Sequence, residues 1–226
     1  MQNSDTVRQK LAAIGISFAI ETKNTEKNVD IEEALILSAQ ILGEGGDAQI
    51  FTPLLSWIMI HGEYVNVERL AKLKLAFEKD HMPLPWISAF SFFGKFCGQT
   101  RWKLLCKPVA ANSCLGDLEL EKSRVEMRGA AAWSLNSGFL VSKTSAIPDP
   151  KYVLHPSQLA RSCHQYRNRL LFGANWRADI IWAIENGAKS PIEISRKTGA
   201  AYETARRIFR EWSLVEGAKK KEKIIS

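Results

Sequence analysis

The sequence has no long hydrophobic run. A membrane-spanning helix needs about 20 predominantly apolar residues, and no stretch of the 226 residues approaches that length. Residues 11–20 are apolar and follow Arg8 and Lys10, as in a signal peptide, but Asp5 interrupts the basic part and no small-residue cleavage site follows. We therefore expect no membrane segment and interpret residues 11–20 as a short amphipathic helix that runs into an extended piece.

Closely spaced metal ligands are also lacking. The chain has four cysteines and four histidines, but no two cysteines form a C-x-x-C pair and the histidines are scattered. Structural metal sites use such pairs to bring two thiolates onto one ion. The neighbouring Cys163 and His164 are more simply explained by packing than by metal binding. We therefore expect no metal and no cofactor, and a reduced protein of the cytoplasm.

Motifs that carry catalysis are missing too. The sequence contains no phosphate loop of the G-x-x-x-x-G-K type, no G-x-G-x-x-G, no G-x-S-x-G and no H-E-x-x-H. His155, Arg161 and His164 lie too close together in the sequence to indicate a nuclease site. Because no motif with a known mechanism is present, we expect a protein that is not an enzyme.

Positive charge is present and is concentrated at one end of the chain. The net charge of the whole chain is +7. Residues 161–226 contain 14 Lys and Arg against 7 Asp and Glu, whereas residues 1–160 contain 17 of each kind. A local excess of this size indicates a polyanionic partner. Nucleic acid is the commonest such partner, followed by an acidic protein or an anionic lipid.

Residues 1–160 have the pattern of a mostly helical domain. Four segments, broken by Gly and Pro, repeat apolar residues at helical spacing: 31–42, 48–61, 66–77 and 85–98. The character of the chain changes in residues 108–156, where 118–127 alternates partly and where 138–143 and 151–154 have the composition of short strands. We leave two interpretations of this section open, a β-hairpin against the helical core or a connecting region with little regular structure.

Residues 161–177 contain four arginines and join this part to the basic end. The spacing predicts a linker helix that packs between the two parts of the chain. Its packing residues are expected to be Tyr166, Leu170 and Phe172. Arg167 and Arg169 would then be left to reach phosphate groups.

Residues 176–199 carry the signals of two helices. The first has its isoleucines along one stripe, and Gly187 is placed to end it. Ser190 offers an N-cap oxygen for the second, and Glu193, three residues later, completes a capping box. Gly199 closes this short helix by taking a positive φ that other residues resist.

The next segment predicts a third helix with two different sides. Ala205, Ile208, Phe209 and Trp212 lie at i, i+3, i+4 and i+7, which is an inward stripe. The opposite side carries Tyr202, Glu203, Thr204, Arg206, Arg207 and Arg210. Residues 213–226 are expected to form two short strands joined by a lysine-rich turn.

This order of elements resembles the winged helix-turn-helix domains of bacterial transcriptional regulators, over residues 176–226 only. The resemblance rests on Gly187, the Ser190-Pro191 start, Ile194, Gly199, the ETARRIF helix and the basic hairpin after Trp212. In that family the second helix of the motif enters the major groove, and the wing touches the adjacent backbone or minor groove. The resemblance implies DNA contacts by Tyr202, Thr204, Arg206, Arg207 and Arg210 on the helix, and by Lys219, Lys220, Lys221 and Lys223 at the wing tip.

We therefore expect a mainly α-helical α+β protein of two domains. Residues 1–160 would form a neutral regulatory or assembly domain, and residues 161–226 a winged helix with its linker helix that binds double-stranded DNA in a cytoplasmic transcriptional regulator of bacterial type. The alternative is a protein-interaction adaptor, or an antitoxin-like repressor, that docks a protein partner through the winged helix or the N-terminal domain. Two questions stay open: whether the protein is a homodimer, since no further helix follows the wing, and whether residues 57–79 form a second winged-helix-like unit.

Overall fold

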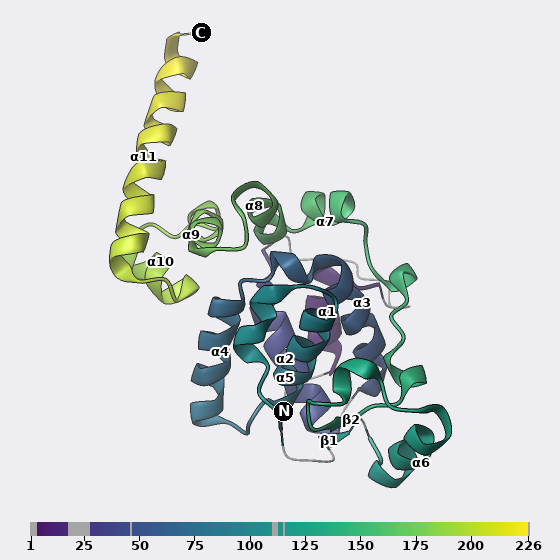
Figure 1. Ribbon diagram of the computed structural model, residues 1–226. Coiled ribbons are helices and arrows are strands. Elements are labelled where there is room, and N and C mark those ends of the chain that lie inside the picture. Colours follow the sequence, from purple (N-terminus) through teal and green to yellow (C-terminus); the bar gives the residue numbers. More distant parts are fainter. Residues whose placement is uncertain (1–3, 18–27, 46, 110–112, 115, 226) are drawn as a thin grey trace.

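Helices make up most of the structure. The computed structural model describes the backbone of residues 4–17, 28–45, 47–109, 113–114 and 116–225 (Figure 1). Side chains are described over the same ranges except for Ser4 and residues 216–225. A mainly helical chain with one very small sheet confirms the coarse fold class that we predicted. Within the described ranges, no helix is both long and apolar enough to cross a bilayer.

The elements follow one another with short connections. The α-helices are α1 (Ser4–Ala13), α2 (Ile31–Gly43), α3 (Phe51–His61), α4 (Val67–Asp80), α5 (Pro85–Phe96), α6 (Leu118–Arg128), α7 (Pro156–Ser162), α8 (His164–Phe172), α9 (Trp176–Glu185), α10 (Pro191–Thr198) and α11 (Tyr202–Ile225). The 3-10 helices are η1 (Ala48–Ile50), η2 (Gly62–Tyr64), η3 (Thr100–Leu105), η4 (Ala132–Ser134), η5 (Lys143–Ala146) and η6 (Pro150–Tyr152). The strands are β1 (Ser113–Cys114) and β2 (Phe139–Leu140).

Helix α2 lies at the centre of the larger core. Most of its residues are buried, as expected for a helix that is apolar around most of its circumference. Its start is set by Asp30, whose side chain accepts a hydrogen bond from the backbone N–H of Glu33 at 3.1 Å. Helices α1, α4 and α5 pack against it, so that α2 is enclosed within the bundle (Figure 1).

Two fully buried tryptophans join the helices around α2. The indole N–H of Trp57 donates to the carbonyl oxygen of Ile14 at 2.7 Å, and that of Trp102 donates to the carbonyl oxygen of Gly62 at 3.0 Å. A buried indole N–H needs such an acceptor, because an unpaired donor loses its bond to water. Helix α5 approaches Trp102 closely at Gly94, where an added Cβ would lie 2.8 Å from the indole Cγ.

The section 108–156 contains a helix where we expected partial strand character. Residues 118–128 form α6, which begins at Asp117, whose side chain accepts from the N–H of Leu120 at 2.8 Å. The alternation of apolar and polar residues was misleading there because Glu, Lys and Arg have good helix propensity.

The two strands of this section do not form a hairpin. β1 and β2 pair in parallel, with Ser113 opposite Phe139, and a parallel pair needs a crossover rather than a tight turn. The strand expected at 151–154 is also wrong, because 150–152 form η6 and Val153 makes only an isolated bridge to Ile16. The hairpin interpretation of residues 108–156 is therefore corrected.

The basic end of the chain is helical where we predicted a wing. Helix α11 continues from Tyr202 to Ile225 without interruption, so the two strands expected after Trp212 were wrong. The segment is rich in Leu, Glu, Ala and Lys, has no Pro, and contains Gly217 as its one strong helix breaker, so helix propensity prevails. At 1.5 Å per residue the helix is about 36 Å long. It projects away from the rest of the molecule (Figure 1).

The buried apolar side chains that the structure describes gather in two clusters. The larger one begins at Val7 and ends at Tyr166 on α8, and the smaller one is formed by α9, α10 and α11. The predicted boundary between residues 160 and 161 falls inside α7, whereas the two clusters meet at the connection 173–175. Helices α7 and α8 therefore pack with the larger core.

The imidazole of His61 is fully buried in the larger core. Its Nε2 lies 2.9 Å from the carbonyl oxygen of Leu154, and its Nδ1 lies 2.8 Å from the hydroxyl of Tyr166. A carbonyl can only accept, so Nε2 carries the hydrogen and Nδ1 accepts from Tyr166. Burial, helped by the charge of His155 and opposed by the bond to Leu154, lowers the pKa of His61 to about 4. The ring is therefore neutral at pH 7.

We expect the free energy of unfolding to fall as the pH is lowered from 6.5 to about 4. In this window the unfolded chain binds a proton at His61 and the folded chain does not, so acid favours unfolding, by up to about 3 kcal/mol. Urea titrations across the window measure the slope. His61→Gln should flatten it, and His81→Gln, at an exposed histidine, should leave it unchanged. Equal slopes in the two variants would contradict the assignment.

A pair of helical glycines tests the close packing of α5. Gly94→Ala should lower the free energy of unfolding by about 1–3 kcal/mol, because its Cβ would be forced against buried Trp102. Gly43→Ala is the matched control, since its Cβ would lie 3.8 Å from Trp86, an ordinary contact. That change should be neutral or stabilising by up to about 1 kcal/mol. Chemical denaturation of the two variants is the measurement, and equal losses would exclude this packing.

Candidate nucleic-acid interface

Helix α10 begins where its sequence predicted. The hydroxyl oxygen of Ser190 accepts from the backbone N–H of Glu193 at 3.3 Å, and Pro191 occupies the first helical position. The carboxylate of Glu193 accepts from the backbone N–H of Lys189 at 2.9 Å, one residue before the cap. The helix start is thus held by bonds in both directions, as in a capping box.

The turn between α10 and α11 is three residues long, 199–201. Gly199 has a φ of 78°, in the left-handed region, and its N–H donates to the carbonyl oxygen of Ser195 at 2.8 Å. The hydroxyl of Ser195 donates to the carbonyl oxygen of Ala200 at 2.7 Å, and the N–H of Ala200 donates to the hydroxyl of Thr198 at 3.2 Å. A short turn with such a glycine is the connection found in helix-turn-helix units.

Helix α11 packs through the stripe that the sequence predicted. Ala205 and Ile208 are buried, and Phe209 and Trp212 are half-buried against the same cluster. The small side chain of Ala205 lets α11 approach its neighbours closely. Phe209 is less buried than we expected, but the orientation of the helix is the predicted one.

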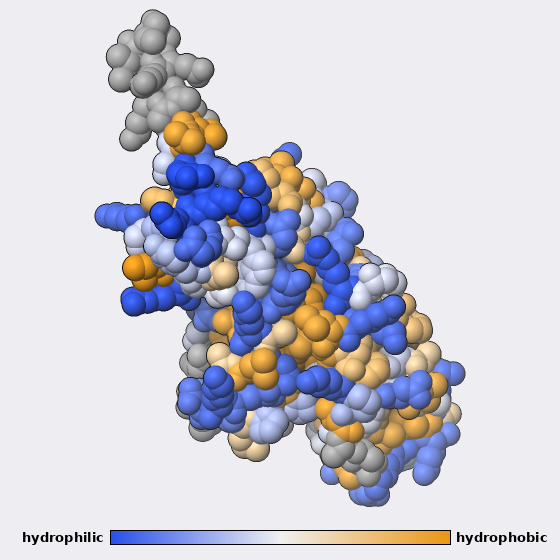
Figure 2. All heavy atoms as spheres, turned by 60° about the vertical axis from the view of Figure 1, so that its left-hand side comes forward, coloured by the Kyte–Doolittle hydropathy of each residue, from blue (hydrophilic) through white to orange (hydrophobic). Residues whose placement is uncertain are grey.

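The opposite side of α11 faces solvent. Tyr202 is 45% exposed, and the side chain of Arg206 is 65% exposed. Arg207 and Arg210 are exposed as well, whereas Thr204 is half-buried. Figure 2 shows strongly hydrophilic residues gathered at the base of the projecting helix. We call Arg206, Arg207 and Arg210 the arginine face.

The arginine face surrounds a small open hollow. Together with Glu203, the three arginines line a space of about 240 Å³. Glu203 lies 3.7 Å from Arg206, and because both side chains are largely exposed this pair adds little stability. Among the described side chains, no carboxylate lies within ion-pair distance of Arg207 or Arg210. Their guanidinium groups are available to a ligand.

The four lysines predicted at a wing tip lie on the far part of α11. Lys219, Lys220, Lys221 and Lys223 belong to the helical backbone of Tyr202–Ile225. Their side chains lie outside the described residues. Their placement on a wing is therefore corrected, and their contact with DNA stays a prediction from the sequence.

Helix α4 of the larger core contacts the turn directly. The Nε of Arg69 donates to the carbonyl oxygen of Thr198 at 3.0 Å, and the Nζ of Lys72 donates to that of Gly199 at 3.0 Å. These carbonyls belong to the last turn of α10 and its cap, where a helix has no acceptors satisfied from within. Lys72 also lies 4.5 Å from the ring centre of Trp176 on α9. The larger core thus supplies the C-terminal cap of α10.

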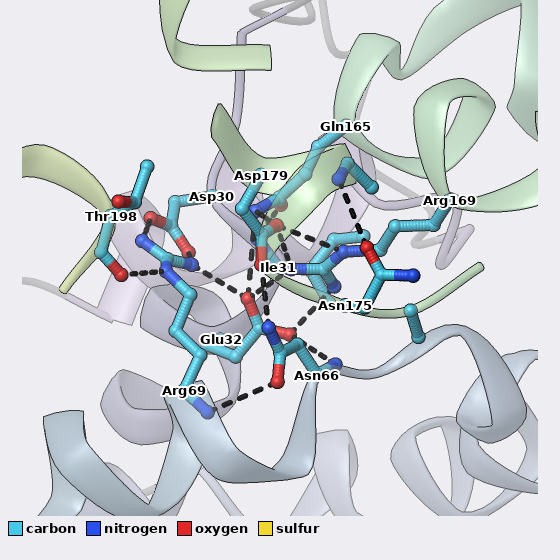
Figure 3. A network of polar contacts seen from close by, with 12 residues as sticks. Asp30, Ile31, Glu32, Asn66, Arg69, Gln165, Arg169, Asn175, Asp179 and Thr198 are labelled. Atoms are coloured by element: carbon cyan, nitrogen blue, oxygen red, sulfur yellow. Dashed lines mark hydrogen bonds and ion pairs between the residues drawn. The ribbon is translucent and has the colours of Figure 1, made fainter. Parts of the chain in front are cut away.

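Arg69 belongs to a buried cluster of charges that joins the two cores (Figure 3). The members of this buried charge cluster are Asp30, Glu32, Arg69, Arg169 and Asp179. They come from the start of α2 and from α4, α8 and α9. The side chains of Glu32, Arg169 and Asp179 have no solvent exposure.

Arg169 makes the most contacts in the buried charge cluster. Its two terminal nitrogens each lie 2.6 Å from an oxygen of Glu32, and one of them also lies 2.6 Å from Asp179. A third acceptor is the carbonyl oxygen of Tyr64, at 3.0 Å. Such two-pronged contacts between guanidinium and carboxylate are the strongest of their kind. The expectation that Arg169 reaches a phosphate was wrong, because this side chain is buried.

The carboxylates of the cluster are satisfied by further donors. The backbone N–H of Asn66 donates to Glu32 at 3.0 Å, and its side-chain amide donates to Asp179 at 2.7 Å. Gln165 donates to Asp179 at 3.2 Å and accepts from the N–H of Ile31 at 2.7 Å. Each buried charge therefore has both a counter-charge and hydrogen bonds, which is the condition for burying it.

The buried pairs shift pKa values in the direction that keeps them charged. Burial alone would raise the pKa of Asp30, but the hydrogen bonds and charge of Arg69 outweigh it and hold that pKa below its usual value. Burial alone would lower the pKa of Arg169, yet Asp179 and Glu32 raise it above its usual value. The cluster is thus ionised at neutral pH.

Sequence reasoning missed the cluster and the role of α4. A signal existed, because Glu32 and Asp179 stand among apolar residues on helices whose other positions are buried. A charge at such a position indicates a buried partner, although it does not identify that partner. Within the described residues, no group of three His, Cys, Asp or Glu side chains is arranged to hold a metal ion.

Comparisons with protein-family profiles, curated proteins and solved structures found no match to this chain. Neither a family nor a related fold assigns a role to these residues. The function must therefore be inferred from the contacts, burial and charge of the chain itself.

Two arginines of α8 test the buried charge cluster. Arg169→Met should lower the free energy of unfolding by about 3–5 kcal/mol, because it leaves Glu32 and Asp179 buried without their counter-charge. Arg167→Met is the matched control: Arg167 pairs with Glu185 at 3.2 Å, but its side chain is 42% exposed. Its loss should change stability by less than about 1 kcal/mol. Urea denaturation at pH 7 compares the two, and similar losses would show that the buried cluster does not join the cores.

Proposed function

We propose that this protein binds duplex DNA through the helix-turn-helix of α10 and α11 and acts as a transcriptional regulator. The observation that carries the proposal is the arginine face on α11, which lies opposite the buried stripe and directly after the three-residue turn. In helix-turn-helix proteins the second helix lies in the major groove and its N-terminal residues meet the base edges. The proposal includes no wing, since α11 replaces it.

The charge of the chain supports a polyanionic ligand at this place. The whole excess of +7 belongs to residues 161–226, and the arginine face supplies three of these charges within the first turns of α11. Phosphate contacts by Lys and Arg provide most of the non-specific affinity of a protein for DNA. The lysines near the end of α11 add further positive charge to the same helix.

The attachment of the motif to the larger core also supports the proposal. A helix that reads a groove must be held at a defined angle, and sites on rigid elements are more precise than sites on loops. Here the turn is held by Arg69 and Lys72, and α9 is held by the buried charge cluster. Residues 1–160 are then the part of the chain that can orient α11, as expected of a regulatory or assembly domain.

A protein-interaction adaptor remains the competing proposal, because an exposed arginine face can also bind an acidic protein. The two differ in their response to salt and in their ligand. DNA binding through phosphates weakens steeply and linearly on a logarithmic scale as salt is raised. An adaptor should retain no duplex under these conditions and should lose its protein partner when the arginines are removed.

We expect Arg207→Ala to weaken binding of the full-length protein to its best duplex by about 1–3 kcal/mol if the side chain meets a base, or to reduce the salt slope by about 1 if it meets a phosphate. Fluorescence anisotropy with labelled duplexes across a salt series measures both quantities. The matched control is Arg161→Ala, an exposed arginine on α7, at the other end of the row formed by α8 and α9 (Figure 1).

The control removes the same charge from a different place and should leave affinity nearly unchanged. Equal losses in the two variants would mean that net charge alone attracts DNA. No salt-sensitive binding of any duplex would overturn the proposed function.

A further inference from the structure

We propose that α11 reads C·G base pairs, with Arg207 and Arg210 contacting guanine and Glu203 contacting cytosine. This inference rests on the proposed function, because it names the sequence chemistry that the same site would select. It depends on which side chains lie directly opposite the buried stripe of α11 and on what those side chains can bond.

The first step is the position of the three side chains on the helix. At 3.6 residues per turn, Glu203, Arg207 and Arg210 lie on the side of α11 opposite Ala205 and Ile208, which are buried. Their spacing of four and three residues puts them on one face. All three line the same open hollow with Arg206. Whatever ligand covers this side of α11 meets these groups together.

The second step is the chemistry of the arginines. A guanidinium donates two parallel hydrogen bonds to the O6 and N7 of guanine, the commonest specific contact in the major groove. Arg207 and Arg210 differ by about 4.5 Å along the helix axis, little more than the 3.4 Å between neighbouring bases of one strand. They can therefore reach neighbouring base pairs. Residues 202–210 contain no Asn or Gln, the side chains that make the matching contact with adenine.

The third step is the carboxylate among the arginines. Glu203 is 76% exposed in its side chain and carries no buried counter-charge that would explain it as structural. A carboxylate on this face repels the phosphate backbone, so it weakens purely electrostatic binding. It can, however, accept a hydrogen bond from the N4 amino group of cytosine. A face that combines guanidiniums with a carboxylate fits the two edges of a C·G pair better than it fits phosphates alone.

The experiment uses the full-length protein and a duplex selected from a random pool. Guanines of the selected duplex are replaced one at a time by 7-deazaguanine, which removes the N7 acceptor and keeps Watson–Crick pairing. We expect a loss of affinity on the order of 5-fold or more at the contacted guanines. In Arg207→Ala or Arg210→Ala the replacement at the matching guanine should change affinity by less than about 2-fold, because the contact is already gone.

Two further variants separate base reading from charge. Arg161→Ala should keep the full sensitivity to 7-deazaguanine, since it leaves α11 unchanged. Glu203→Gln removes a negative charge, so it should strengthen binding to unselected duplexes while it narrows the preference for the selected site over one with T·A in place of C·G. If Glu203→Gln strengthened binding to all duplexes equally, the contact with cytosine would be excluded.

The outcomes distinguish this inference from the function on which it rests. Selected sites made of A·T pairs, or sites insensitive to 7-deazaguanine, would overturn the reading of C·G pairs and leave duplex binding standing. Failure to retain any duplex from the pool at low salt would overturn both. Sensitivity at one or two neighbouring guanines that disappears in the arginine variants is the result that we expect.

Discussion

The arrangement of the two cores depends on one buried carboxylate, that of Glu32. It lies at the start of the central helix α2 and bonds both Arg69 and Arg169 with no exposure to solvent. Arg169 in turn holds Asp179 of α9, and Arg69 holds the end of α10. Because the guanidiniums are withdrawn from water, they are stable only beside their carboxylates. The charge pattern therefore selects one position of α9 and α10 against the helical bundle, which apolar contact alone would specify less sharply.

This selection explains how a small motif can be presented by a much larger neutral part. The second core is small and consists of three helices, of which α11 extends well beyond the packed region (Figure 1). Its own apolar contacts could not define the direction of so long a helix relative to the rest of the molecule. The contacts of Arg69 and Lys72 with the turn supply this definition. Orientation of α11 is therefore a property of α4 as much as of the motif.

The helix-turn-helix was predictable because its signals are local. Ser190, Gly199 and the stripe from Ala205 act on residues within a few positions, and each appears in the structure as the sequence indicated. The wing was not predictable, since a lysine-rich segment gives helix propensity and short strand patterns equal claim until packing decides. The buried charge cluster was beyond sequence reasoning for another reason. Arg169 and Glu32 are 137 residues apart, and a charge among apolar residues does not say which distant partner it meets.

The contacts of α4 with the turn go to backbone carbonyl oxygens of residues 197–199 and not to side chains. A carbonyl is the same whatever residue carries it, so this attachment is indifferent to most changes in the motif's composition. Only Gly199, with its positive φ, has to stay as it is. The exposed positions of α11 could thus be exchanged for others while the helix kept its angle. The chain has the properties of a scaffold on which new sequence preferences can be built by changing a few surface residues.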